Sequence, residues 1–237
     1  MESGLLYLIP TSLGEGDLAW VLPEQVRRVT ASLDTFIVEH PKTARHFLKL
    51  IGTATPLQEL HLLTLDEHTK TEQLEALLKP VQSGKNVGLL SEAGCPAVAD
   101  PGANLVALAH RKNIKVVPLV GPSSILLALM ASGMNGQRFA FQGYLPTDKL
   151  EREKRIVELE TESRKKDQTQ IFIEAPYRNQ QLFESLVKTC GTDTRLCIAT
   201  DISLASECIL TKFISDWKKS PPDIQKKPSI FLIYTGH

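Results

Sequence analysis

The residues best suited to touch a ligand lie between Ser91 and Gly102, a stretch that contains two acids, two glycines and two prolines. An apolar run, Val87–Leu90, precedes it and predicts a buried strand. A helical pattern with Leu105, Leu108 and Ala109 on one face follows it. Open α/β sheets bind ligands at the carboxyl ends of their strands, and small residues there let backbone groups approach the ligand. The spacing therefore predicts a ligand-binding loop.

The ligand of this loop is not expected to be a nucleotide phosphate. No G-x-x-x-x-G-K-[ST] run is present, and Gly14-Glu15-Gly16 continues as Asp17-Leu18-Ala19, which breaks the dinucleotide pattern G-x-G-x-x-G. Glu15 and Asp17 would also repel a pyrophosphate. S-adenosylmethionine fits better, because it has a sulfonium, an ammonium and little net negative charge. Methyl transfer from it is an in-line displacement in which the enzyme mainly supplies alignment.

Apolar runs and helical patterns alternate over the first 135 residues, which predicts a parallel sheet with helices on both faces. The expected strands are Leu5–Ile9, Phe36–Glu39, Leu60–Leu65, Val87–Leu90 and Ile114–Val120. Between them we expect a polar helix after the turn Leu13–Asp17, and helices over Lys42–Leu50, Thr71–Gln82 and Ile125–Ser132.

The second half has a different pattern, with a hinge expected at Asn135–Gln137. Its strand candidates are Arg138–Tyr144, Gln170–Glu174, Leu196–Thr200, Cys208–Phe213 and Ile230–Tyr234, and its helices are Glu151–Arg164 and Gln180–Thr189. No helix fits between the third and fourth strands, so some pairing must be antiparallel. We therefore expect an α/β domain over residues 1–135 and a mixed α+β domain over 136–237. A cleft between them would collect the loops Pro10–Asp17, Ser91–Gly102 and Gly121–Ser124.

Composition and charge narrow the classes of protein to which the chain could belong. The 27 basic and 27 acidic residues give zero formal net charge, which argues against a general nucleic-acid coat but not against a local basic patch. The four cysteines form no C-x-x-C pair, so no metal site is expected. The start lacks a basic segment, and no apolar run reaches the ~18 residues of a membrane span. We expect a cytoplasmic protein with reduced thiols and no membrane contact.

Four motifs, in order along the chain, resemble those of the tetrapyrrole methylase superfamily, in the branch of the 16S rRNA ribose 2′-O-methyltransferase. Ser91–Gly102 resembles SDAGTPxISDPG, Gly121–Ser124 resembles GPSA, Gln142–Pro146 resembles GFLP, and Glu174–Arg178 resembles EAPHR. The resemblance covers essentially the whole chain. It implies two α/β domains with S-adenosylmethionine between them, and a homodimer.

The resemblance also implies a set of cofactor-binding positions, carried over motif by motif. They are Pro10, Ser91, Glu92, Ala93, Cys95, Val98, Ser123, Ser124, Gln142, Pro228 and Ser229.

The departures from the family pattern concern the loops expected to face the methyl acceptor. The branch has EDTR where this chain has Glu39-His40-Pro41-Lys42, and YHEHN where it has Leu65–Thr69. A hydroxyl acceptor must lose a proton, so Glu39, Lys42 and His68 are the catalytic candidates. The alternative for all three is an ordinary structural or solvated role.

The sequence thus predicts an S-adenosylmethionine-dependent methyltransferase. Within that class, a ribose 2′-hydroxyl of small-subunit rRNA leads by resemblance, with the small ribosomal subunit as partner. A tetrapyrrole or another small molecule is the alternative acceptor. The alternative to an enzyme is a module that binds the cofactor without catalysis. Basic runs such as Lys226-Lys227 either touch RNA or are simply solvated.

Overall fold

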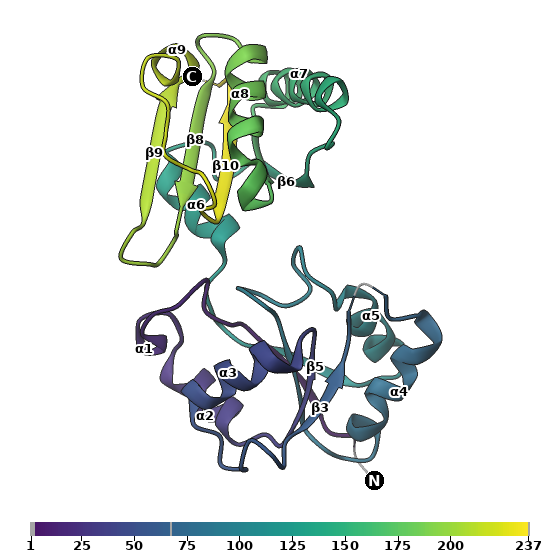
Figure 1. The fold of residues 1–237 in the computed structure, drawn as a ribbon. Helices are drawn as coiled ribbons and strands as arrows, with labels where there is room; N and C mark the ends of the chain where they lie inside the picture. The colour runs from purple at the N-terminus through teal and green to yellow at the C-terminus, as the bar shows by residue number, and fades with distance from the viewer. Residues whose placement is uncertain (1–2, 67, 237) are drawn as a thin grey trace. The chain divides into compact units, whose positions relative to one another are not determined.

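A computed structural model describes residues 3–66 and 68–236, and the chain divides into two compact units, residues 1–123 and 124–237 (Figure 1). The division lies ahead of Asn135–Gln137, where the sequence predicts the hinge, so the helix that starts at Ser124 belongs to the second unit. The exact domain limits stay a prediction.

The first unit is a parallel sheet in the order β3-β2-β4-β1-β5, as the alternating pattern predicts. Its strands are β1 (Leu5–Ile9), β2 (Thr35–Val38), β3 (His61–Thr64), β4 (Val87–Leu90) and β5 (Lys115–Pro118). Its helices are α1 (Leu18–Val21), α2 (Glu24–Ala31), α3 (Pro41–Ile51), α4 (Thr71–Gln82) and α5 (Ala103–Arg111).

Alternate strand residues of this sheet enter two different cores, because successive side chains of a strand point to opposite faces. Leu6, Ile37 and Leu89 pack with the apolar residues of α4 and α5. Ile9 and Phe36 pack with those of α1, α2 and α3. Both faces are thus covered, which is what a parallel sheet with strands buried on both sides requires.

The second unit has a mixed sheet in the order β6-β7-β10-β8-β9. β6 and β7 are parallel, whereas β10 pairs antiparallel with β7 and β8, and β8 pairs antiparallel with β9. The antiparallel pairing expected from the short β8–β9 connection is confirmed. The strands are β6 (Phe139–Tyr144), β7 (Thr169–Ile173), β8 (Arg195–Thr200), β9 (Cys208–Phe213) and β10 (Ser229–Tyr234). The helices are α6 (Ser124–Ser132), α7 (Lys149–Lys166), the short 3-10 helix η1 (Pro176–Arg178), α8 (Asn179–Thr189) and α9 (Ile214–Trp217).

One predicted helix is wrong in detail. The polar helix expected after Asp17 is two helices, because Leu22 is extended and Pro23 starts a new helix as the N-cap of α2. Proline disfavours helical backbone in the residue before it, which ends α1 at this point. The residues 214–217 also form a short helix, α9, that the sequence analysis did not predict.

The described residues show neither a membrane-spanning helix nor a cluster of metal-binding side chains. No helix there has both the length and the apolar character needed to cross a membrane. No group of three or more histidine, cysteine, aspartate or glutamate side chains in that part of the chain is placed to hold a metal ion.

Candidate functional site

The carboxyl ends of β1 and β4 form a switch point of the first sheet. The chain leaves β1 toward the face that α1, α2 and α3 cover, and leaves β4 toward the face covered by α5. Neighbouring loops that depart to opposite faces open a crevice between them, and doubly wound sheets bind ligands there. The fold therefore predicts a ligand site between the loops after β1 and β4.

Backbone hydrogen bonds join these two loops. The Thr11 N–H donates to the Gly94 carbonyl at 2.9 Å, and the Gly94 N–H donates to the Thr11 carbonyl at 3.3 Å. The buried Ser91 hydroxyl donates to the same Gly94 carbonyl and lies 3.3 Å from the Thr11 hydroxyl oxygen. The two loops thus form one hydrogen-bonded unit that fixes the position of residues 91–94.

The loop after β5 completes the arrangement. A Cβ atom added to Gly121 would lie 2.3 Å from Cγ of Pro10, so only glycine allows the two backbones to approach so closely. The Cys95 thiol donates to the Pro122 carbonyl, with 3.4 Å between sulfur and oxygen. Three loops far apart in the sequence therefore meet at one end of the first sheet.

The loop after β4 has an unusual backbone conformation. Gly94, Ala97, Ala99 and Gly102 all have positive φ, at 75°, 64°, 55° and 135°. Two of these are alanines, for which this conformation is strained, and such strain is typical of functional loops. The backbone N–H groups of Ala93 and Cys95 have no hydrogen-bond partner among the described residues.

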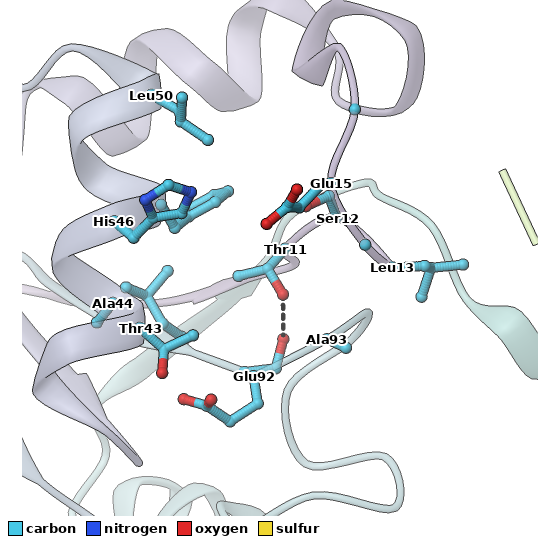
Figure 2. Close-up of a pocket in the computed structure, with 15 residues that line it drawn as sticks. Thr11, Ser12, Leu13, Glu15, Thr43, Ala44, His46, Leu50, Glu92 and Ala93 are labelled. Atoms are coloured by element: carbon cyan, nitrogen blue, oxygen red, sulfur yellow. Dashed lines mark hydrogen bonds between the residues drawn. The ribbon is translucent and has the colours of Figure 1, made fainter. Parts of the chain in front are cut away.

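A cavity of about 480 Å³ lies between the loop after β1, the helix α3 and the loop after β4 (Figure 2). It lies entirely within the first unit and falls in the range of about 300–1,000 Å³ that is usual for small-molecule sites. Its lining residues are Thr11–Gly16, Thr43, Ala44, His46, Phe47, Leu50 and Leu90–Ala93.

Helical spacing explains the contribution of α3 to the cavity. Thr43, His46, Phe47 and Leu50 follow one another at intervals of three, one and three, which puts them on one side of a helix. His46 is exposed on α3 and Glu15 on the loop after β1, and their side chains point toward each other from opposite walls (Figure 2). The cavity therefore combines apolar walls with one imidazole and two carboxyl groups, those of Glu15 and Glu92.

A cluster of three acidic residues, Glu39, Glu92 and Asp100, borders the cavity at Glu92. Burial, together with the charges of Glu39 and Glu92, raises the pKa of Asp100 from 3.8 to about 7. His40 Nδ1 lies 3.6 Å from Glu92 Oε1. The carboxyl groups of Glu39 and Glu92, which follow β2 and β4, thus concentrate negative potential, which favours a ligand that carries positive charge.

These features fit S-adenosylmethionine. The partnerless N–H groups of Ala93 and Cys95 suit its carboxylate, and the neighbouring carboxyl groups suit its sulfonium and ammonium charges. The small residues at 93, 94 and 121 leave the backbone accessible. The bound cofactor would supply a methyl group on a positively charged sulfur. The protein would supply alignment and a favourable field.

The structure brings together many of the cofactor positions predicted in the first unit. Ser91, Glu92 and Ala93 line the cavity, Pro10 packs on Gly121, and Cys95 bonds to Pro122. Val98 is 49% exposed on the loop after β4, and Ser123 lies in the loop that follows β5.

The other predicted cofactor positions lie in the second unit. Ser124 is the first residue of α6. Gln142 on β6 donates to Gln170 Oε1 at 2.8 Å and accepts from Arg155 at 3.0 Å. Pro228 accepts from the Asp201 N–H, and the buried Ser229 accepts from Asn179 at 3.1 Å. Every cofactor contact in both units stays a prediction.

The three catalytic candidates do not line the cavity. Glu39 follows β2 and is the neighbour that raises the pKa of Asp100. Lys42 is exposed in the first turn of α3, and His68 is exposed in the turn after β3, where its N–H donates to Asp66 at 3.0 Å. Their catalytic role also stays a prediction.

The sequence analysis missed His46, Thr43 and Asp100 as site residues. For the first two a signal existed, since the helix after β2 was predicted and the spacing of 43, 46, 47 and 50 defines one of its sides. Nothing in the residue order indicated which side would face a cavity. The pKa of Asp100 depends on burial and on two charges from other segments, which only the folded chain brings together.

Solved structures of methyltransferases share this fold. The structure matches the methyltransferase CobJ with a TM-score of 0.64 and 18% identity, covering 98% of this chain and 94% of that one. It also matches the cobalt precorrin-4 methyltransferase CbiF with a TM-score of 0.60 and 16% identity, covering 97% and 94%. At such identities the likeness shows the fold alone.

Sequence comparison adds the family. The model of the Tetrapyrrole (Corrin/Porphyrin) Methylases matches residues 6–216, so this chain belongs to the tetrapyrrole methylase family. A protein of Escherichia coli O157:H7 named ribosomal RNA small subunit methyltransferase I is 30% identical over 239 residues, which span all of this chain and 79% of that protein. Its Vibrio cholerae namesake is 29% identical, over 98% of this chain and 77% of its own length. The chain is an S-adenosylmethionine-dependent methyltransferase.

Proposed function

We propose that this protein transfers a methyl group from S-adenosylmethionine to rRNA of the small ribosomal subunit, at a ribose 2′-hydroxyl. The similarity to relatives named for that rRNA, at about 30% identity over nearly the whole chain, carries the proposal. The cytoplasm, where ribosomal subunits are found, is the compartment that follows from it. A homodimer is the proposed assembly.

We assign the acceptor to the cavity between α3 and the loops after β1 and β4. The cavity borders the loop after β4, where the cofactor is predicted, so donor and acceptor would meet at Glu92 and Ala93. An acceptor hydroxyl must lose its proton during transfer, and a histidine is a common proton acceptor. His46 on α3 is the imidazole that lines the cavity, and it is our candidate for this role.

The test is labelled-methyl transfer with the purified protein. Small ribosomal subunits and deproteinised rRNA from a strain that lacks the protein serve as acceptors, beside a uroporphyrin-type tetrapyrrole. We expect label in rRNA, at a ribose. Label in the tetrapyrrole alone would contradict the rRNA assignment, and binding of the cofactor without transfer to any acceptor would favour a binding module.

The placement of the site is tested by filling it. Ala93 is exposed and lines the cavity, so Ala93→Trp should block ligand binding while the chain still folds. We expect at least a tenfold loss of methyl transfer, with Ala54→Trp as the matched control on an exposed loop outside the cavity. His46→Asn should lower methyl transfer and leave cofactor affinity, measured by calorimetry, within twofold. Equal activity of Ala93→Trp and the control would refute the placement.

A further inference from the structure

We propose that Tyr144, Tyr177 and Arg178 of the second unit form a stacking surface for unpaired RNA bases, which we term the tyrosine–arginine surface. The inference rests on the proposed function, in which RNA is the acceptor. It assigns a binding role to two motifs, Gln142–Pro146 and Glu174–Arg178, that the cavity of the first unit leaves unused.

Strand register brings the three residues to the carboxyl ends of two neighbouring parallel strands, β6 and β7. Tyr144 is the last residue of β6 and pairs with Ile173, the last residue of β7. η1, which contains Tyr177 and Arg178, follows β7 after two residues. Tyr144 is 61% exposed and Tyr177 is 72% exposed. Both large rings are thus mostly exposed to solvent, although burying them would have favoured folding.

The arginine is held in a fixed position against one of these rings. Its guanidinium carbon lies 5.4 Å from the centre of the Tyr177 ring. Glu174, whose side chain is only 1% exposed, accepts from Arg178 Nε at 2.8 Å and lies 2.6 Å from Nη2 through the same oxygen. The hydrogen bond to Glu174 raises the pKa of Arg178, and Tyr177 and Tyr144 raise it in the same direction, so both rings are within electrostatic range of the guanidinium.

Backbone contacts make the surface rigid. The Arg178 N–H donates to the Ala175 carbonyl at 2.8 Å, and the Lys226 N–H donates to the Pro176 carbonyl at 3.1 Å. Asn179 Nδ2 donates to the Lys227 carbonyl at 2.7 Å. A surface fixed before binding loses little entropy when a ligand arrives, which increases affinity.

The chemistry of the surface matches single-stranded RNA. Unpaired bases stack on aromatic rings and on guanidinium planes, with little dependence on sequence. Lys226 is exposed and has no ion pair among the described residues, so it is available for a phosphate next to a stacked base. Arg178 is itself paired with Glu174, so its part is stacking and orientation rather than neutralising a phosphate.

The carboxyl group beneath the arginine gives independent support. Glu174 Oε2 is buried and has no hydrogen-bond partner in the described part of the chain. Leaving a buried acceptor unsatisfied lowers stability, and natural proteins accept such losses mainly at functional sites. The Glu174–Arg178 pair is thus better explained by orienting Arg178 than by stabilising the fold.

The test measures direct binding of a labelled single-stranded oligoribonucleotide by fluorescence anisotropy, without methyl transfer. Tyr177→Ala should weaken binding by about 5- to 100-fold, the loss expected for one stacked base. Tyr177→Phe keeps the ring and should bind within twofold of the unchanged protein. Trp20→Ala removes a ring that is 82% exposed in the first unit and should have no effect.

Three outcomes would overturn the inference. The first is that the unchanged protein does not bind the oligonucleotide, and the second is that Tyr177→Ala binds it as tightly as the unchanged protein does. The third is that Tyr177→Ala loses as much affinity for a fully paired duplex of the same sequence as for the single strand. A change in sedimentation of Tyr177→Ala with unaltered RNA binding would assign the surface to contact between copies instead. Failure of the proposed function appears separately, as absence of label in rRNA despite normal oligonucleotide binding.

Discussion

Asp100 is the residue whose ionisation the fold alters most clearly among the site residues. Its pKa rises from 3.8 to about 7 because the carboxyl group is buried and faces the charges of Glu39 and Glu92. The folded chain therefore holds this proton at pH values where the unfolded chain has released it. By linkage, the free energy of unfolding decreases as pH rises from about 4 to about 7, and the loss is complete above that range.

Asp100→Asn should therefore stabilise the protein, and more so at higher pH. We expect a melting temperature a few degrees above that of the unchanged protein at pH 8, and a smaller difference at pH 5, since about 1 kcal/mol corresponds to about 2–4 °C for a chain of this size. Melting curves of both proteins between pH 5 and pH 8 provide the measurement. A difference that is constant with pH would show that the Asp100 carboxyl is not protonated near neutrality.

At the residue scale, the sequence predicts the small and polar members of the site better than the large ones. The loop that contains Ser91, Glu92 and Ala93 was predicted from its place after an apolar strand, and the family resemblance implied these three residues individually. All three line the cavity, and their contact with the cofactor stays a prediction. His46 was not predicted as a site residue, because exposed histidines are common on helices. Whether such a histidine lines a cavity depends on which loop packs opposite it. Sequence patterns give the face of a helix, whereas the partner of that face is a property of the tertiary structure.

At the scale of elements, the loops after β1 and β5 can approach each other closely only because residue 121 is a glycine and has no Cβ atom. Gly121→Ala would place Cβ 2.3 Å from a ring carbon of Pro10, and a proline ring cannot rotate away. We expect a loss of about 1–3 kcal/mol in the free energy of unfolding, as for other overpacked sites. Urea unfolding followed by circular dichroism measures it.

Gly136→Ala is the matched control for this prediction. A Cβ atom at that position meets nothing within 4 Å, and its backbone has no positive φ, so stability should change by less than about 0.5 kcal/mol. Equal stability of the two variants would mean that the loops separate at little cost. In that case the arrangement of the three loops could not be attributed to the contact between Pro10 and Gly121.

The elements themselves were largely predictable, and the reason is periodicity. All ten strands were expected within two residues of their observed limits, because short apolar runs flanked by glycine, proline or polar residues are unambiguous here. The division of α1 from α2 was not predicted, because a single polar helix was expected after the turn Leu13–Asp17. The short α9 was missed because four residues carry no periodic signal.

At the scale of the whole molecule, α6 suggests how two copies would associate. Nearly all its residues are apolar, and such a helix is normally buried on every side. Ala128 and Leu129 are buried, but Met130 is 79% exposed. The proposed homodimer would cover this methionine.

Sedimentation equilibrium should therefore give about twice the chain mass of 26.2 kDa. Met130→Glu would bring a charge into the contact and should shift the protein toward the monomer. Leu150→Glu changes an equally exposed side chain on α7 and serves as the control. A single-chain mass for the unchanged protein, or dissociation by the control alone, would contradict this assignment.

The contact between Thr11 and Gly94 is made by backbone atoms, whereas the opposite wall of the cavity is made by side chains of α3. The two walls therefore differ in how they tolerate change. A substitution at Thr43 or Leu50 alters the shape of the cavity and leaves the joined loops intact, because neither residue takes part in that contact. If the acceptor binds in this cavity as we propose, single changes at these two positions of one helix would admit new acceptors, while the methyl-donor side would be inherited unaltered.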